Sequence, residues 1–206
     1  MNRFSVCRGA TPLFVACQNG YLECVIELIE NKANYNRIRE VDKATPLMIA
    51  SYNGHESVVK YLLSCKNINI LHRNKDNLNA FTCAATSLHK DICDHLYTYV
   101  MNEYLYQSDA KEVVNFINQG DNDDCLTPLM RACLPQDQEK GIKIVKWLVD
   151  TCKVKLDPKC REGKTALEWA TIMRTTMLQS GWHRKNLNLM LNLDENCTKK
   201  VIFKSV

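Results

Sequence analysis

Two segments of this chain are near copies of one another, displaced by 34 residues. The first reads ATPLFVACQNGYLECVIELIE with its TPL at Thr11, and the second reads ATPLMIASYNGHESVVKYLLS with its TPL at Thr45. A degraded third copy begins at Asn79, and further matches begin at Thr127 and Thr165. Self-similarity at one period indicates a row of like units, each stacked on its neighbours.

Each copy predicts two short helices joined by a tight turn. A Thr precedes both Pro12 and Pro46; that Thr is a good N-cap, and Pro is tolerated at the first helical position because its missing N–H would have no partner there. Gly20 and Gly54 suit a left-handed helix end. Residues 58–63 supply an apolar stripe to the second helix. Such a pair cannot bury both of its apolar sides alone, so stacking is predicted.

On these residues the chain resembles the ankyrin repeat family, whose pattern runs TPLHxAAxxGHxxVVxxLL. The resemblance implies an all-α fold, a helix-turn-helix solenoid with short β-hairpin loops. It also implies a non-catalytic protein that uses no cofactor and binds a partner through its hairpin tips and the concave surface of its inner helices. The matching residues are Thr11, Pro12, Leu13, Ala16 and Gly20 in the first copy, Thr45, Pro46, Leu47, Ala50, Gly54 and His55 in the second, and Thr127, Pro128, Leu129 and Ala132 in a later one.

We expect one repeat domain over residues 1–193, followed by a C-terminal tail over residues 194–206. The first TPL lies only ten residues after Met1, so no polar capping repeat precedes it. Either residues 1–10 fold back as a cap, or another protein covers that end. The expected repeats are 1–36, 37–70, 71–100, 101–120 (degenerate), 121–156 and 157–193.

Glycine is scarce, with 7 in 206 residues, and the scarcity follows the repeats. The place of the glycine before TPL is taken by Lys43, Asn77 and Cys125, and that of the glycine between the helices by Leu88 in the third copy. Asn visits the left-handed conformation, and Lys does so at some cost. The turns are therefore expected to have drifted from the family pattern in the middle of the stack.

The chain has 11 cysteines, an odd number, and no CxxC pair. Without a visible export signal, such cysteines are expected to be free thiols in a reducing, cytoplasmic setting. Five fall on positions where the pattern wants a small apolar core residue, and we expect these to be buried. They are Cys17, Cys24, Cys83, Cys93 and Cys133.

Several classes of function are disfavoured. The net charge of +4 is spread evenly, which argues against nucleic acid, and no apolar run is long enough to cross a membrane. His89 and Cys93 would share a helix face but His95 would not, so no metal is expected. No phosphate-loop or paired-carboxylate motif is present, so we expect neither an enzyme nor a small-molecule substrate.

The resemblance carries partner-binding positions onto this chain, although each could equally be solvated surface. A basic cluster of Arg37, Arg39, Arg73 and Lys75 predicts an acidic segment on the partner. Hairpin positions are Arg37, Arg39, Asp42, Arg73, Lys75 and Arg161. Inner-helix positions are Gln18, Asn19, Tyr52, Asn53, Thr86 and Ser87.

Residues 101–126 break the period. The tyrosines around Tyr104 and Tyr106 either pack over this irregular joint or form an exposed aromatic patch for a partner. Lys140, Lys143 and Lys146 read as a solvated helix face, or else as a binding stripe. We expect a protein–protein interaction module, a scaffold or adaptor. The alternative is a structural subunit built permanently into a large assembly, for example a cytoskeletal or axonemal one.

Overall fold

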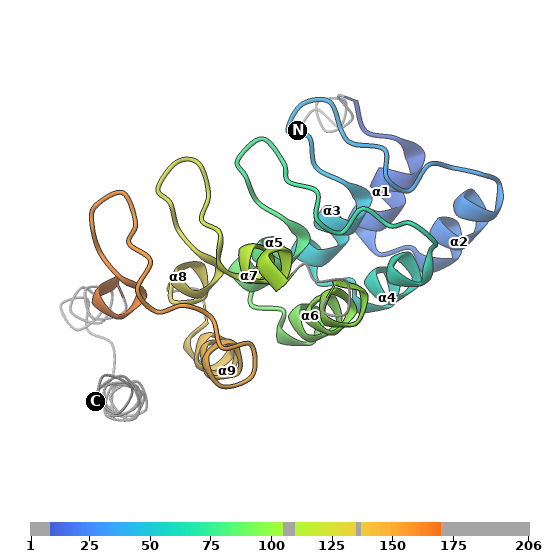
Figure 1. Ribbon diagram of the computed structural model, residues 1–206. Helices are drawn as coiled ribbons and strands as arrows, with labels where there is room; N and C mark the ends of the chain where they lie inside the picture. Colours follow the sequence, from blue (N-terminus) through green and yellow to red (C-terminus); the bar gives the residue numbers. More distant parts are fainter. Residues whose placement is uncertain (1–8, 105–109, 135–136, 170–206) are drawn as a thin grey trace.

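The computed structural model describes residues 9–104, 110–134 and 137–169. Within them the chain is all-α, and its helices form two rows (Figure 1). The inner row holds α1 (Pro12–Asn19), α3 (Pro46–Asn53), α5 (Ala80–Thr86) and α8 (Pro128–Ala132). The outer row holds α2 (Leu22–Glu30), α4 (Glu56–Ser64), α6 (Lys90–Tyr104) and α9 (Gln138–Asp150), with α7 (Ala110–Asn118) at the joint and one further helical turn at 166–169.

The inner helices begin at the N-caps that the repeats predict. The Thr11 hydroxyl accepts the backbone N–H of Phe14 at 3.1 Å, and Thr45 does the same for Met48 at 3.2 Å. In the degraded third copy, the amide oxygen of Asn79 accepts the N–H of Thr82 at 2.8 Å. Asn is as good an N-cap as Thr, so the third repeat keeps its helix start.

The loops between the repeats have the outline of hairpins (Figure 1) but form no strand within the described residues. One main-chain bond closes the neck of each loop, such as Arg39 N–H to Ala44 O at 2.8 Å and Asn74 N–H to Leu78 O at 2.9 Å. The expected short β-hairpins are therefore not observed, because a strand ladder needs more than one such bond.

The turns keep one backbone conformation although their residues differ. Just before the inner helices, φ is 72° at Gly9, 61° at Lys43, 64° at Asn77, 57° at Cys125 and 76° at Gly163. All five lie in the left-handed region that disfavours residues with a Cβ. The sequence has drifted here while the geometry has not, and Lys43 and Cys125 hold it under strain.

The left-handed turn between the helices of a pair favours glycine for a second reason, the lack of room for a Cβ. A Cβ at Gly20 would lie 2.3 Å from the His55 ring, and one at Gly54 would lie 2.5 Å from the His89 ring. Each histidine thus lies directly on the glycine of the preceding repeat. Leu88, at the same position in the third repeat, also has positive φ, 60°, and its side chain is buried.

The core follows the inner helices. Leu13, Leu47, Phe81 and Leu129, which share one motif position, are at most 3% exposed. The predicted burial of cysteines is confirmed for Cys17, Cys83 and Cys93, and burial raises the pKa of the Cys17 and Cys83 thiols to about 12. Cys133 is half-buried.

The prediction for Cys24 is wrong, because this cysteine is exposed. It occupies the position that Val58 fills in α4, where the side chain is fully buried. All nine described cysteines are free thiols.

The joint after the third repeat differs from the regular helix pairs. α6 has 15 residues against 9 in α2 and α4. α7 packs Val113, Phe116 and Ile117 into the core against α5, α6 and α8. The described residues between 101 and 120 supply the end of α6 and α7, and α8 contacts α5 directly, so the inner row passes from α5 to α8.

The tyrosines of this joint mostly pack. Tyr97 meets Trp147 edge to face, with ring centroids 5.9 Å apart, and Tyr99 and Tyr104 are half-buried against the core. Packing over the joint is therefore what the structure shows for these three. Tyr106, most of the expected N-terminal cap (residues 1–8), and the region 170–206 with the expected tail all lie outside the described residues.

Replacing Lys43 by Gly should stabilise the fold. Gly removes the cost of holding a Cβ in the left-handed region, and this gain is partly offset because Gly has more conformational entropy in the unfolded chain. The free energy of unfolding should therefore rise by about 1 kcal/mol. Urea denaturation measures the change. Lys146→Gly, in the exposed middle of α9, is the matched control and should lose about 1 kcal/mol. A loss of stability in both variants would contradict the assignment of strain to Lys43.

Candidate protein-binding surface

Neighbouring loop tips are linked by main-chain hydrogen bonds. Lys75 N–H donates to Asp42 O at 2.9 Å, and Arg161 N–H donates to Asp124 O at 2.8 Å. Between these pairs, Asn122 N–H donates to the carbonyl of the second tip, Asp76 O, at 3.1 Å. The tips therefore form a continuous row along one side of the stack (Figure 1), and its spacing is set by the backbone.

Arg39 and Asp42, at the first tip, are engaged with each other. The guanidinium binds the carboxylate through two nitrogens, with Nε to Oδ1 at 2.9 Å, and the Arg39 guanidinium carbon lies 4.6 Å from the centroid of the Phe14 ring. The hydrogen bond from Arg39 holds the pKa of Asp42 below its usual value. This pair closes the loop over the first inner helix, so its charges are not free for a partner.

The rest of the predicted basic cluster divides in two. Arg73 is half-buried and donates to Asn77 O at 3.1 Å and to Asn115 O at 3.3 Å, so it ties the second loop to α7. Arg37 is 61% exposed with Glu40 at 4.0 Å, and Lys75 is exposed with its Nζ 3.3 Å from Val41 O. Arg37 and Lys75 are the two members of the cluster that present charge to solvent.

The opposite charge also occurs along the tips. Asp76, Asp123 and Asp124 are exposed on the second and third tips. Arg161 on the last described tip donates to Asn122 O at 3.1 Å. The tips therefore alternate in sign, which favours a partner with a mixed charge pattern over a uniformly acidic one.

A second band of candidates lies along the inner helices, which we call the inner row surface: Gln18, Asn19, Tyr52, Asn53, Thr86 and Ser87. Several of these are tied down locally. Asn53 donates its Nδ2 to Gln18 O at 2.8 Å, and Thr86 donates to Thr82 O at 2.8 Å. Tyr52 differs, because its large side chain is 49% exposed.

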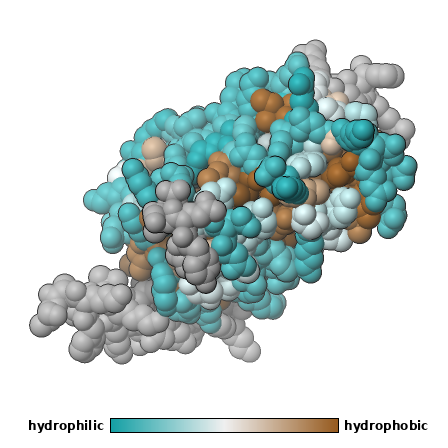
Figure 2. All heavy atoms as spheres, turned by 45° about the vertical axis from the view of Figure 1, so that its right-hand side comes forward, coloured by the Kyte–Doolittle hydropathy of each residue, from teal (hydrophilic) through white to brown (hydrophobic). Residues whose placement is uncertain are grey.

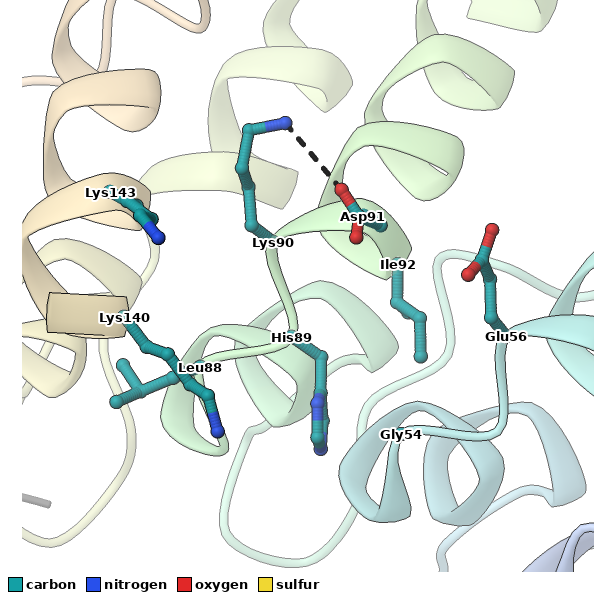
Figure 3. Close-up of a pocket in the computed structure, with 9 residues that line it drawn as sticks. All are labelled: Gly54, Glu56, Leu88, His89, Lys90, Asp91, Ile92, Lys140 and Lys143. Carbon is teal, nitrogen blue, oxygen red and sulfur yellow. Dashed lines mark ion pairs between the residues drawn. The ribbon is translucent and has the colours of Figure 1, made fainter. Parts of the chain in front are cut away.

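A groove of about 350 Å³ that the sequence did not reveal lies on the turn side of the stack (Figure 3). Its wall joins the turns before α4 and α6 to the first turns of α9, and burial lowers the pKa of His89 in that wall. Each lysine around it has an acidic neighbour: Lys90 with Asp91 at 3.8 Å, Lys140 with Asp137 at 3.4 Å and Lys143 with Glu139 at 2.6 Å. Lys140 and Lys143 of α9 thus lie on a solvated helix face, and each forms an ion pair with a nearby acidic residue of the same segment.

A buried ion pair under the third tip was also missed. Asp121 is 5% exposed and accepts from the Arg131 guanidinium, with Nη2 to Oδ2 at 2.5 Å. In the preceding loops the same place holds Arg39 and Arg73. An acidic residue, Asp121, thus replaces the arginine of the earlier loops, and its charge is balanced by Arg131 of α8, which lies beneath the loop.

The described residues contain no group of three or more His, Cys, Asp or Glu side chains arranged to hold a metal ion. His95, part of the only metal-like cluster weighed from sequence, lies 3.0 Å from Glu56 instead. Over the same residues, none of the helices has the length and apolar character needed to cross a membrane.

The stacked helix pairs and linked loops define a helical repeat protein. Residues 2–74 match the family model described as ankyrin repeats (3 copies). This part of the chain thus consists of ankyrin repeats, and beyond residue 74 the structure continues the same two rows of helices. No curated protein matches the chain.

Replacing Asp42 by Ala should destabilise the fold by about 1 kcal/mol at neutral pH, because Arg39 and the first loop lose their anchor. The folded pKa of Asp42 lies below its ordinary value of 3.8. The contribution is therefore complete above that value and is lost as the pH falls through the folded pKa. Urea denaturation at decreasing pH should show wild type and variant converging, whereas Asp123→Ala, at an exposed tip residue, should cost little at any pH.

Proposed function

We propose that this chain is a non-catalytic protein–protein interaction module whose partner lies across the inner row surface and the loop tips, with Tyr52 at the centre of the contact. The observation that carries the proposal is the 49% exposure of Tyr52 on an inner helix, within the region matched to ankyrin repeats. Such repeats are in general protein-binding modules. Tyrosine is among the residues most enriched at binding hot spots, because it buries a large area at low entropic cost.

The charges around Tyr52 supply specificity in this proposal. Arg37 and Lys75 remain available to an acidic group of the partner, whereas Arg39 and Arg73 are held within the chain. Asp76 and Asp124 on the next tips would meet basic groups. The partner segment we propose is therefore acidic where it meets Arg37 and Lys75, and basic where it meets Asp76 and Asp124.

We further propose that the module acts in a reducing compartment such as the cytoplasm, without cofactor or metal. The nine free thiols of the described residues support this setting, since burial has placed three of them at no more than 4% exposure with a raised thiol pKa. Ankyrin repeat proteins are typically non-catalytic. Binding is then the whole of the biochemical role that we assign.

A second candidate role is that of a subunit held permanently in a large assembly. The observation favouring it is the exposure of Cys24 at the first repeat, where later repeats are covered. Sedimentation of the purified chain separates the two roles. A monodisperse monomer with one cooperative unfolding transition supports the module, and aggregation relieved only by the host complex supports the subunit.

Tyr52→Ala should weaken partner binding by about tenfold or more, because a hot-spot tyrosine contributes at least ~1.4 kcal/mol. The chain, its Tyr52→Ala variant and its Tyr21→Ala variant would each be used to capture partners from the source cells, followed by quantitative mass spectrometry. Tyr21, at 60% exposure, is the matched aromatic away from the inner row.

Proteins kept by wild type and Tyr21→Ala but lost with Tyr52→Ala are the partners that the proposal requires. Their affinity for each purified variant would then be measured by titration calorimetry. Equal retention of every captured protein by Tyr52→Ala would count against the inner row surface as the binding site.

A further inference from the structure

The first repeat exposes positions that later repeats bury. Cys24 is exposed, while Val58 and Ile92, one and two periods further on, are 0% and 2% exposed. A following repeat is present in every case, so it cannot account for the difference. These positions are therefore covered from the preceding side, and the first repeat has no such cover among the described residues.

Other residues of the first repeat are also more exposed than their counterparts in the second. Leu28 is half-buried while Leu62 is fully buried, and Pro12 is exposed while Pro46 is buried. Tyr21, 60% exposed, stands where histidines of later repeats lie on a preceding glycine. We call the set Pro12, Tyr21, Cys24 and Leu28 the leading face. Figure 2 brings this end of the stack forward, and apolar residues form an interrupted band across it.

An acidic stripe runs beside the leading face on the same helix. Glu23, Glu27 and Glu30 recur at helical spacing and are exposed, and none has an ion-pair partner among the described residues. Glu30 is the last residue of α2, where the helix dipole disfavours a negative charge. At the same positions α4 carries Ser57, Tyr61 and Ser64.

We propose that the leading face binds a basic amphipathic helix of a partner protein, with its apolar stripe on Cys24 and Leu28 and its lysines or arginines beside the acidic stripe. The occupant should be a helix because α4 is covered at these positions by α2, and α6 by α4. It should be basic because three exposed carboxylates without an ion pair among the described residues border the apolar surface. One of them, Glu27, accepts a hydrogen bond from the neutral Asn31 amide at 2.9 Å. This surface lies apart from Tyr52, so the inference stands independently of the proposed function.

The structure provides a reporter on this surface and an internal control. Cys24 lies within the leading face and Cys125 lies on a loop tip, and both are exposed. The probe is a synthetic helical peptide of about 18 residues, five turns, with leucines at positions i, i+4 and i+7 and lysines on both sides. A matched peptide carries glutamates in place of the lysines.

Native alkylation of the full chain by iodoacetamide, read for each cysteine by mass spectrometry, tests the proposal. The basic peptide should slow alkylation of Cys24 about fivefold or more, since a packed interface excludes solvent, and leave Cys125 unchanged. The protection should weaken as salt is raised. No protection of Cys24, equal protection of both cysteines, or equal protection by the acidic peptide would overturn it.

Charge-reversal variants test whether the protection depends on the acidic stripe itself or only on the net charge of the chain. Glu23→Lys with Glu27→Lys should abolish the protection, whereas Glu103→Lys with Glu112→Lys, the same change on exposed residues of α6 and α7, should retain it. Tyr52→Ala should also retain it. Loss of protection in both charge variants, or protection of Cys24 by the chain's own self-association without peptide, would overturn the proposal.

Discussion

The fold depends on each helix pair being buried from both sides by its neighbours. Val58 and Leu62 of α4 are fully buried because a pair precedes them and another follows, whereas Cys24, one period earlier, is exposed. A stack of this kind has no single central core, and its stability is close to a sum of neighbouring contacts. Among the described residues, the first repeat is therefore where positions that later repeats bury remain exposed.

This dependence explains how the turns tolerate residues that suit them poorly. The backbone before each inner helix is left-handed at Gly9 and Gly163, and equally so at Lys43 and Cys125. A Cβ there costs about 1–2 kcal/mol, yet the geometry is unchanged. The packed helices on both sides determine the path of the loop, and the loop residue adopts whatever conformation that path requires.

Nearest-neighbour packing also explains why the joint after the third repeat does not interrupt the stack. α7 belongs to no helix pair among the described residues. It is held by the burial of Phe116 and by the hydrogen bonds that its carbonyls accept from Arg73 and Asn79. The inner row continues from α5 to α8 because only those two surfaces need to match. The insertion thus alters the stack locally while the inner row stays continuous.

The sequence by itself determined the period, the helix starts and the residues of the inner core. These are local properties: Thr45 caps its own helix, and Leu47 repeats the position of Leu13 whatever lies beside it. For the candidate site, the sequence indicated loop tips and inner helices, with Tyr52 as one of six inner-helix candidates, and these positions remain a proposal. The sequence overestimated how many arginines of the basic cluster are available to a partner. It cannot show that a carboxylate engages Arg39 or that a carbonyl engages Arg73.

Only the tertiary structure decided which of these residues are free. Arg73 donates to a carbonyl 42 positions away, and Asp121 accepts from an arginine of α8. Cys24 is exposed because no described repeat covers it from the preceding side. Burial and charge pairing depend on the unit alongside, and a repeat motif does not specify its neighbour. The motif therefore determines how each unit folds, and the packing of units determines what the surface presents to a partner.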